Sequence, residues 1–349
     1  MKKIVLLLVL ISNIAFSQVK QIPEDGITKI IALFKEKPLI AIGETHGHKQ
    51  LYQFLTKLVQ SEGFYKNVNA ILIESGNALY QKTLDKYISG EDVPLSELQK
   101  VWMNTTQSPV DAWSVDVYYI FLKTIRELNN KNPKRYQIRV IAADPPIEWM
   151  NVNTNKEYIT ARGSRNKFYA KTAIEEVLNK KQKALLINGG AHFGYTNAKK
   201  VNGIIEKTHP NTVTVILATS GLGRANKAME KKLRNWPKGT ITKLKNTWIG
   251  KLPGPRRMVM RTSNQNSAST NPMPTTNSTK PKGTLKEDYA DFLLYFGSID
   301  EIEYGTIDAK IYRSNKVWKE LNRRSLIRFN NKLTEKSRKT GELRPLAYN

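Results

Sequence analysis

Cysteine is absent from this sequence of 349 residues. Its absence excludes a disulfide framework, a thiol nucleophile, thiolate zinc sites, iron–sulfur clusters held by the chain's own cysteines and a lipid-modified cysteine. The fold must therefore be stabilised by a packed core. About 330 residues follow the first apolar run, which is enough for one large α/β domain with extensions or for two domains.

Long apolar runs are also scarce, and the one candidate lies at the start of the chain. Lys2 and Lys3 precede the run Ile4–Phe16, which ends in the small-residue pattern Ala15-Phe16-Ser17. A membrane-spanning helix needs roughly 20 apolar residues, so this shorter run is typical of a secretory signal. We expect a signal peptide over residues 1–17, export to the periplasm or the outside of the cell, and no transmembrane segment in the mature protein.

Acidic residues are few, since 30 Asp and Glu stand against 56 Lys and Arg and the formal net charge is +26. Two windows, residues 221–258 and 313–349, carry net charges of +10 and +8, which is most of the excess. One interpretation is a basic surface for an anionic envelope partner. The other is ordinary solvated surface rich in lysine. An exported protein rarely meets nucleic acid, so we expect no nucleic-acid partner.

Short β-branched runs alternate with amphipathic helical stretches, which is the pattern of βα units. The runs are apolar throughout, as expected of parallel strands covered on both faces. We therefore predict an α/β fold with a mainly parallel sheet and helices on both faces. The expected strands are Pro38–Ile42, Ala70–Ile73, Gln137–Ala142, Lys183–Ile187, Thr212–Leu217 and Asp291–Phe296, and the first is followed by a helix over His48–Glu62.

Residues 79–134 contain helical signals and no strand, which indicates a helical insertion after the second strand. Its clearest helix is Trp113–Asn129, which either packs on the sheet or forms a lid over the site. Residues 261–285 are rich in Ser, Thr, Asn and Pro and are expected to form a flexible linker. The predicted organisation is a signal peptide, an α/β domain over 18–260, this linker, and a final strand with basic C-terminal helices over 286–349.

Acids and histidines follow four of the predicted strands. The carboxyl ends of parallel strands meet at one edge of a sheet, where ligands commonly bind. Three of the chain's four histidines fall in these loops. The candidate site residues are Glu44, His46 and His48 after the first strand, Glu74 after the second, Asp144 after the third and His192 after the fourth.

These residue types in this arrangement indicate acid–base chemistry. Glu74 directly follows four apolar residues, where an unpaired carboxylate would be costly, so it needs a charged or hydrogen-bonding partner. His46 beside Glu74 would form the usual pair that activates water near neutral pH. Two alternatives stay open, because Asp144 also fits a helix cap and a mixed imidazole and carboxylate set also suits a divalent metal ion.

The loop Gly43–Gly47 (GETHG), the strand ending in Glu74, the helix Trp113–Asn129 and the strand leading to Asp144 form an unusual combination. Together, over roughly residues 39–298, they resemble the erythromycin esterase-like superfamily, which includes ChaN-type haem-uptake proteins and Tiki-type proteases. For an esterase, the resemblance implies that His46 is the general base, that Glu44 and Glu74 assist it, and that His192 completes the site.

One departure favours the haem-uptake branch of that superfamily. The esterases carry an aromatic-arginine stretch soon after the loop, whereas this chain reads HKQLYQ over residues 48–53. The alternative hypothesis is thus an uptake protein without catalytic activity that binds haem or a divalent metal, with His46, His48 or Tyr195 as ligands. A third hypothesis, a structural role on an anionic envelope surface, rests on the two basic windows alone.

The leading hypothesis is an exported hydrolase that cleaves an ester or related bond of a small-molecule substrate. In this hypothesis His46 is the base and Glu74 orients it. Glu44 and His192 polarise the substrate or water. Asp144 supports the site.

Overall fold

The computed structural model describes residues 22–109, 115–218, 231–254, 285–298, 301–306 and 308–340. The predicted signal peptide, all but the last residue of the predicted linker, and Trp113 lie outside these ranges. Among the described residues, no helix is both long enough and apolar enough to cross a bilayer.

A sheet of eight strands forms the centre of the protein, in the order β1-β7-β8-β6-β2-β5-β3-β4. The six strands from β8 to β4 pair in parallel, and β7 pairs antiparallel with both β8 and β1. The strands are β1 Glu24–Asp25, β2 Leu39–Glu44, β3 Ala70–Asn77, β4 Arg139–Asp144, β5 Ala184–Gly189, β6 Val213–Ala218, β7 Thr240–Lys243 and β8 Phe292–Tyr295. The mainly parallel α/β fold is therefore confirmed.

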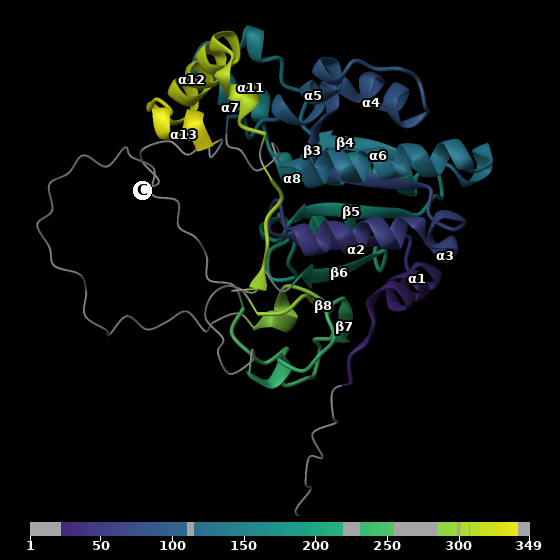
Figure 1. The fold of residues 1–349 in the computed structure, drawn as a ribbon. Helices are drawn as coiled ribbons and strands as arrows, with labels where there is room; N and C mark the ends of the chain where they lie inside the picture. The colour runs from purple at the N-terminus through teal and green to yellow at the C-terminus, as the bar shows by residue number, and fades with distance from the viewer. Residues whose placement is uncertain are drawn as a thin grey trace, which may run out of the picture.

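Both faces of the sheet are covered, because successive strand residues point to opposite sides. Ile40 and Ile42 of β2 belong to one core, whereas Leu39 and Ala41 belong to the other. Figure 1 shows α2 and α6 lying across the near face of the sheet. Helices of the first core are α1 Gly26–Glu36, α2 Lys49–Gln60, α3 Glu62–Tyr65, α4 Gln81–Ile88, α5 Leu95–Met103 and α6 Asp116–Lys131; those of the second are α8 Arg165–Ala173, the π-helix η5 Ile174–Leu178 and α9 Val201–Glu206.

Single helical turns connect several of these elements. They are η1 Ala78–Tyr80, η3 Lys134–Tyr136, η4 Trp149–Asn151, η6 Gly190–His192 and η8 Lys286–Asp288. The helix α7 Asn155–Arg162 starts with a capping box, in which the Thr154 hydroxyl accepts from the Glu157 amide and the Glu157 carboxylate accepts from the Thr154 amide. This short helix is therefore stable at its first turn without a long apolar face.

The insertion between β3 and β4 is helical, as predicted, and its described residues form α4, α5, α6 and two single turns. Leu84, Val101 and Ile125, one from each helix, are fully buried in the first core. The insertion is thus a helical layer packed on the sheet. Fully burying one such side chain contributes roughly 1.5–3 kcal/mol, so the layer is held firmly.

The described residues of the C-terminal region form the helices α11 Lys310–Arg313, α12 Asn315–Phe329 and α13 Glu335–Thr340. Tyr312, Trp318, Leu321 and Leu333 form a small core of their own. Figure 1 shows these helices beside α7, at one end of the molecule. Two further strands, β1 and β7, were not predicted, and they place β8 inside the sheet instead of at its edge.

Candidate functional site

The predicted strand-end acids lie on neighbouring strands. Glu44 ends β2, Glu74 lies in β3 and Asp144 ends β4, and β5 runs between the first two. Each of the three residues is 4 % exposed or less. Carboxylates this deeply buried are costly unless cations or hydrogen-bond donors surround them.

A local irregularity of β3 brings Glu74 into this position. The register with β4 shifts between Ile73 and Asn77, as in a β-bulge, which re-aims side chains at a strand end. Gly76 permits this close pairing, since a Cβ atom there would stand 2.8 Å from the Cβ atom of Ala142. The close packing against Ala142 thus explains why a glycine follows the second predicted strand.

Arg165 forms ion pairs with two of the three acids. Its Nη2 atom donates to Oε1 of Glu74 at 2.5 Å, and its Nε atom donates to Oδ1 of Asp144 at 2.8 Å. Arg165 is the first residue of α8, a helix that packs on the second face and begins near the carboxyl edge. Our sequence reasoning missed it; the only local signal is its place at the start of a helix after the third predicted strand.

The two acids respond differently to the same arginine. Burial raises the pKa of Glu74, but His192 and Arg165 lower it by more, so that it lies well below the usual 4.5. Burial also raises the pKa of Asp144, and there it outweighs the opposing effects of Arg165 and Thr106, so that the pKa lies above the usual 3.8. Glu74 is therefore the more firmly ionised of the pair.

Glu74 accepts hydrogen bonds from donors on three different segments. Besides Arg165, these are the Gln107 amide nitrogen at 2.7 Å and the Gly189 backbone N–H at 2.6 Å, and Nε2 of His192 lies 3.1 Å from the same carboxylate. Gln107 was not predicted either, because it belongs to a loop of the insertion with no motif. Such a carboxylate is an electrostatic anchor for the whole cluster.

His46 is paired with Glu44, whereas we expected Glu74 to orient it. Nδ1 of His46 lies 3.0 Å from Oε1 of Glu44. Burial lowers the pKa of His46, whereas the hydrogen bond to Glu44 and the charges of Glu74 and Glu44 raise it, and the net result is a pKa above 6.5. The adjacent carboxylate that orients His46 is therefore Glu44, two residues away in the same loop.

His192 is held on both sides of its ring. Nδ1 lies 2.5 Å from Oδ1 of Asn166, and the Asn166 amide nitrogen donates to the Lys199 carbonyl oxygen, which fixes the orientation of that amide. Nε2 faces Glu74 and lies 3.4 Å from Nη1 of Arg165. The predicted histidine after β5 thus belongs to the cluster.

Gly189 brings the two halves of the site together. A Cβ atom at this position would stand 2.9 Å from Cε1 of His46 and 3.4 Å from Oε2 of Glu74. The His46–Glu44 pair and the group around Glu74 therefore meet over one glycine and form a single site.

The basic groups are the accessible part of this site. The side chains of His46, His192 and Arg165 keep 28 %, 20 % and 12 % of their surface exposed, whereas those of Glu44, Glu74 and Asp144 keep at most 2 %. A ligand that reaches the site meets imidazole and guanidinium groups first, and the carboxylates hold those groups from behind.

His48 and Tyr195, the other expected ligands, contact different parts of the protein. His48 is fully buried, its ring packs edge-on against Phe296 with centroids 5.3 Å apart, and burial lowers its pKa to about 4. The Tyr195 hydroxyl donates to Oδ2 of Asp291 at 2.5 Å, and burial raises its pKa. His48 would have to leave the core, and Tyr195 its acceptor, before either could ligate haem.

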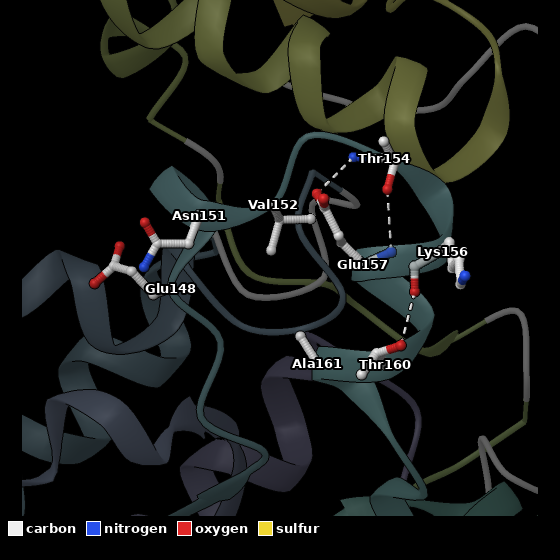
Figure 2. Close-up of a pocket in the computed structure, with 8 residues that line it drawn as sticks. All are labelled: Glu148, Asn151, Val152, Thr154, Lys156, Glu157, Thr160 and Ala161. Carbon is white, nitrogen blue, oxygen red and sulfur yellow. Dashed lines mark hydrogen bonds between the residues drawn. The ribbon is translucent and has the colours of Figure 1, made fainter.

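Two further features bear on ligand binding. Within the described ranges, no group of three or more His, Asp or Glu side chains is arranged to hold a metal ion. A surface hollow of about 610 Å³ lies near η4 and α7. Figure 2 shows the residues that line it, and none of them belongs to the acid and histidine cluster. The cluster, defined by its chemistry, remains the candidate site.

The chain was compared with known proteins. No protein-family model matches it, and no curated protein matches it. Three solved structures are similar: ChaN of Campylobacter jejuni, reported with cofacial haem binding (14 % identity, 55 % of this chain and 85 % of that one, TM-score 0.34); the type III effector HopBA1 (18 %, 60 % and 90 %, 0.33); and a Bacillus cereus protein (12 %, 80 % and 92 %, 0.45). These similarities concern the fold only.

Gly189→Ala should disturb the site without disturbing the fold. The new methyl group would press on His46 and move its ring, so we expect a shift in the His46 ring signal and in its titration midpoint by NMR. Gly190→Ala is the matched control, because its methyl group would meet Leu217 at 3.3 Å and no site side chain. An unchanged His46 signal in Gly189→Ala would contradict the geometry described above.

Glu74→Gln should destabilise the protein more than Asp144→Asn does. The first change leaves Arg165 beside a neutral group in place of a firmly ionised one, and removing one partner of a buried pair costs about 3–5 kcal/mol. Asp144 gains less from ionisation, since its pKa is raised. Urea unfolding at pH 7 measures both free energies, and a reversed order would refute this division.

The same pKa shift gives a pH dependence. Because the folded pKa of Glu74 lies below its unfolded value, its contribution is present at neutral pH and is lost as pH falls below about 4.5 toward the folded value. The difference in unfolding free energy between wild type and Glu74→Gln should therefore shrink on acidification over that window, and a constant difference would contradict it.

Proposed function

We propose that this protein is an exported hydrolase that uses a histidine-activated water to cleave an ester or related bond of a small molecule. The observation that carries the proposal is the partly exposed His46 ring paired with the buried Glu44 carboxylate at 3.0 Å. A carboxylate on Nδ1 keeps the proton there and directs Nε2 toward its target. His46 then takes a proton from water as a general base, and Glu44 stabilises the imidazolium that forms.

Arg165 supplies positive charge where the reaction develops negative charge, and the His192 ring lies beside its guanidinium. Attack of water on an ester carbonyl produces an oxyanion, which preorganised donors stabilise more in a dry site than in bulk water. Glu74 and Asp144 fix Arg165 from behind, so its guanidinium need not reorganise during the reaction. Asp144 acts in this proposal through Arg165 and not on the substrate.

Export and attachment to the envelope belong to the same proposal. Lys2, Lys3 and the apolar run after them support export. The C-terminal helices and the loops between them expose a set of lysines that would favour an anionic surface: Lys316, Lys319, Lys332, Lys336 and Lys339. Haem uptake has less support in the geometry, because His48 is buried and Tyr195 is bonded to Asp291.

His46→Gln should abolish hydrolysis and leave the fold intact. Loss of a general base costs about 10²- to 10⁴-fold in rate. The assay is turnover of a panel of p-nitrophenyl esters of different chain lengths by the purified mature protein, with circular dichroism to check folding. His209→Gln is the matched control, because it changes a histidine outside the site whose Nδ1 lies 2.9 Å from the hydroxyl oxygen of its neighbour Thr208. Unchanged turnover in His46→Gln, or a histidine-dependent Soret band with haemin and no turnover, would refute the proposal.

The pH profile should report the raised pKa of His46. A general base must be neutral, so kcat/KM should fall on the acid side with a midpoint above pH 6.5. Glu44→Gln removes the negative charge that helps to raise this pKa and leaves only a neutral acceptor, while burial still lowers the pKa, so the midpoint should move to lower pH. A midpoint that does not move in Glu44→Gln would show that His46 is not the titrating base.

A further inference from the structure

The basic C-terminal helix α12 divides its cations into two groups. Its lysines, Lys316 and Lys319, are exposed, whereas Arg323, Arg324 and Arg328 are buried or half-buried and donate to the rest of the protein. If the basic C-terminal window were only solvated surface, these three arginines would face water and would not donate to other parts of the protein. Arginine is suited to such contacts because its planar fork donates in fixed directions.

Two of these arginines hold one loop, residues 104–109, which follows α5. Nη1 of Arg324 donates to Oδ1 of Asn104 at 2.8 Å and to the Ser108 hydroxyl at 3.0 Å. Nη1 of Arg328 donates to the carbonyl oxygens of Gln107 and Ser108, the second at 2.7 Å. The loop has no regular secondary structure, so its carbonyl groups need outside donors, and α12 supplies them.

The same loop reaches the candidate site from its other side. Thr106 donates to Asp144 through its backbone N–H at 2.5 Å and its hydroxyl at 2.8 Å. Gln107 donates to Glu74 at 2.7 Å. The two acids that fix Arg165 are therefore each bonded to a residue of this loop.

Aromatic stacking strengthens the connection. The guanidinium of Arg324 lies 5.0 Å from the centre of the Trp149 ring, and that of Arg328 lies 5.3 Å from the centre of the Tyr158 ring. The Trp149 and Tyr158 rings stack with centroids 5.8 Å apart, and the Tyr158 hydroxyl donates to the Thr106 carbonyl oxygen at 3.1 Å. Rings and guanidinium groups together immobilise the loop from α12.

We propose that Arg324 and Arg328 are positioning residues of the candidate site. They hold the loop in the one conformation in which Thr106 and Gln107 orient Asp144 and Glu74, and through these acids Arg165 and His192. The C-terminal helices are thereby part of the site's framework. The consequence for turnover rests on the proposed hydrolase function, whereas the consequence for the histidines does not.

The test uses His192, in the site, and His209, outside it, as reporters. In Arg328→Gln, we expect the ring signal of His192 to shift by NMR, because Glu74 beside it is less well held, while that of His209 stays unchanged. Arg338→Gln is the matched control. Arg338 also donates to backbone carbonyl oxygens, those of Tyr312 and Arg313, but these lie within the C-terminal helices. An unchanged His192 in a folded Arg328→Gln protein overturns the proposal.

A second variant covers the case in which Arg328→Gln loosens the C-terminal helices as a whole. Arg328→Lys keeps the charge but loses the planar fork, so we expect a smaller shift of His192 in the same direction and a fold that remains intact. No shift in Arg328→Lys, or a shift of equal size in Arg338→Gln, overturns the positioning role.

Turnover separates this proposal from the proposed function. If the wild type hydrolyses an ester, Arg328→Gln should lower kcat/KM by about 10- to 100-fold, the cost of misplacing groups at a reacting centre. Arg338→Gln should stay within about twofold of the wild type. If the wild type hydrolyses none of the esters, the hydrolase proposal fails, and the His192 shift still decides the role of Arg328.

Discussion

The ion pairs of Arg165 with Glu74 and Asp144 are the interaction on which the rest of the site depends. Three carboxylates lie buried at the carboxyl edge of the sheet, and a buried carboxylate without a cation would take up a proton or unfold the region. One arginine pairs with two of them, and the His46 ring lies within hydrogen-bond distance of the third. Because each carboxylate has such a partner behind the opening, two histidines and the guanidinium can remain partly exposed toward a ligand.

The sheet and the acids at its edge could be predicted because they depend on local pattern. Apolar runs of four to six residues indicate parallel strands, and polar residues directly after them meet at the carboxyl edge of the sheet. Glu44, His46, Glu74, Asp144 and His192 were all placed in one cluster on that basis, and the structure brings all of them together. The edge strand β1 and its neighbour β7 are short and pair antiparallel, and they carry no such pattern.

The partners of those acids could not be predicted, since they come from segments remote in the chain. Gln107 is 33 residues from Glu74, and Arg328 is 221 residues from the carbonyl oxygen of Gln107 that it bonds. Neither follows a strand, and neither lies in a motif. The pairing of His46 with Glu44 is a finer case of the same limit. We expected Glu74 to orient His46, but Glu74 pairs with Arg165, which no local pattern points to.

The structure also changes how the basic composition of the C-terminal region is interpreted. An excess of Lys and Arg in a C-terminal window indicates an anionic partner only if the charges are free to meet one. In α12 the arginines bond backbone carbonyl oxygens and stack on aromatic rings, so they are committed within the protein, and only the lysines face solvent. Net charge therefore overstates the surface that an anionic envelope would meet. The contacts of these arginines also link the C-terminal helices to Glu74 and Asp144, because the loop 104–109 that they hold carries Thr106 and Gln107.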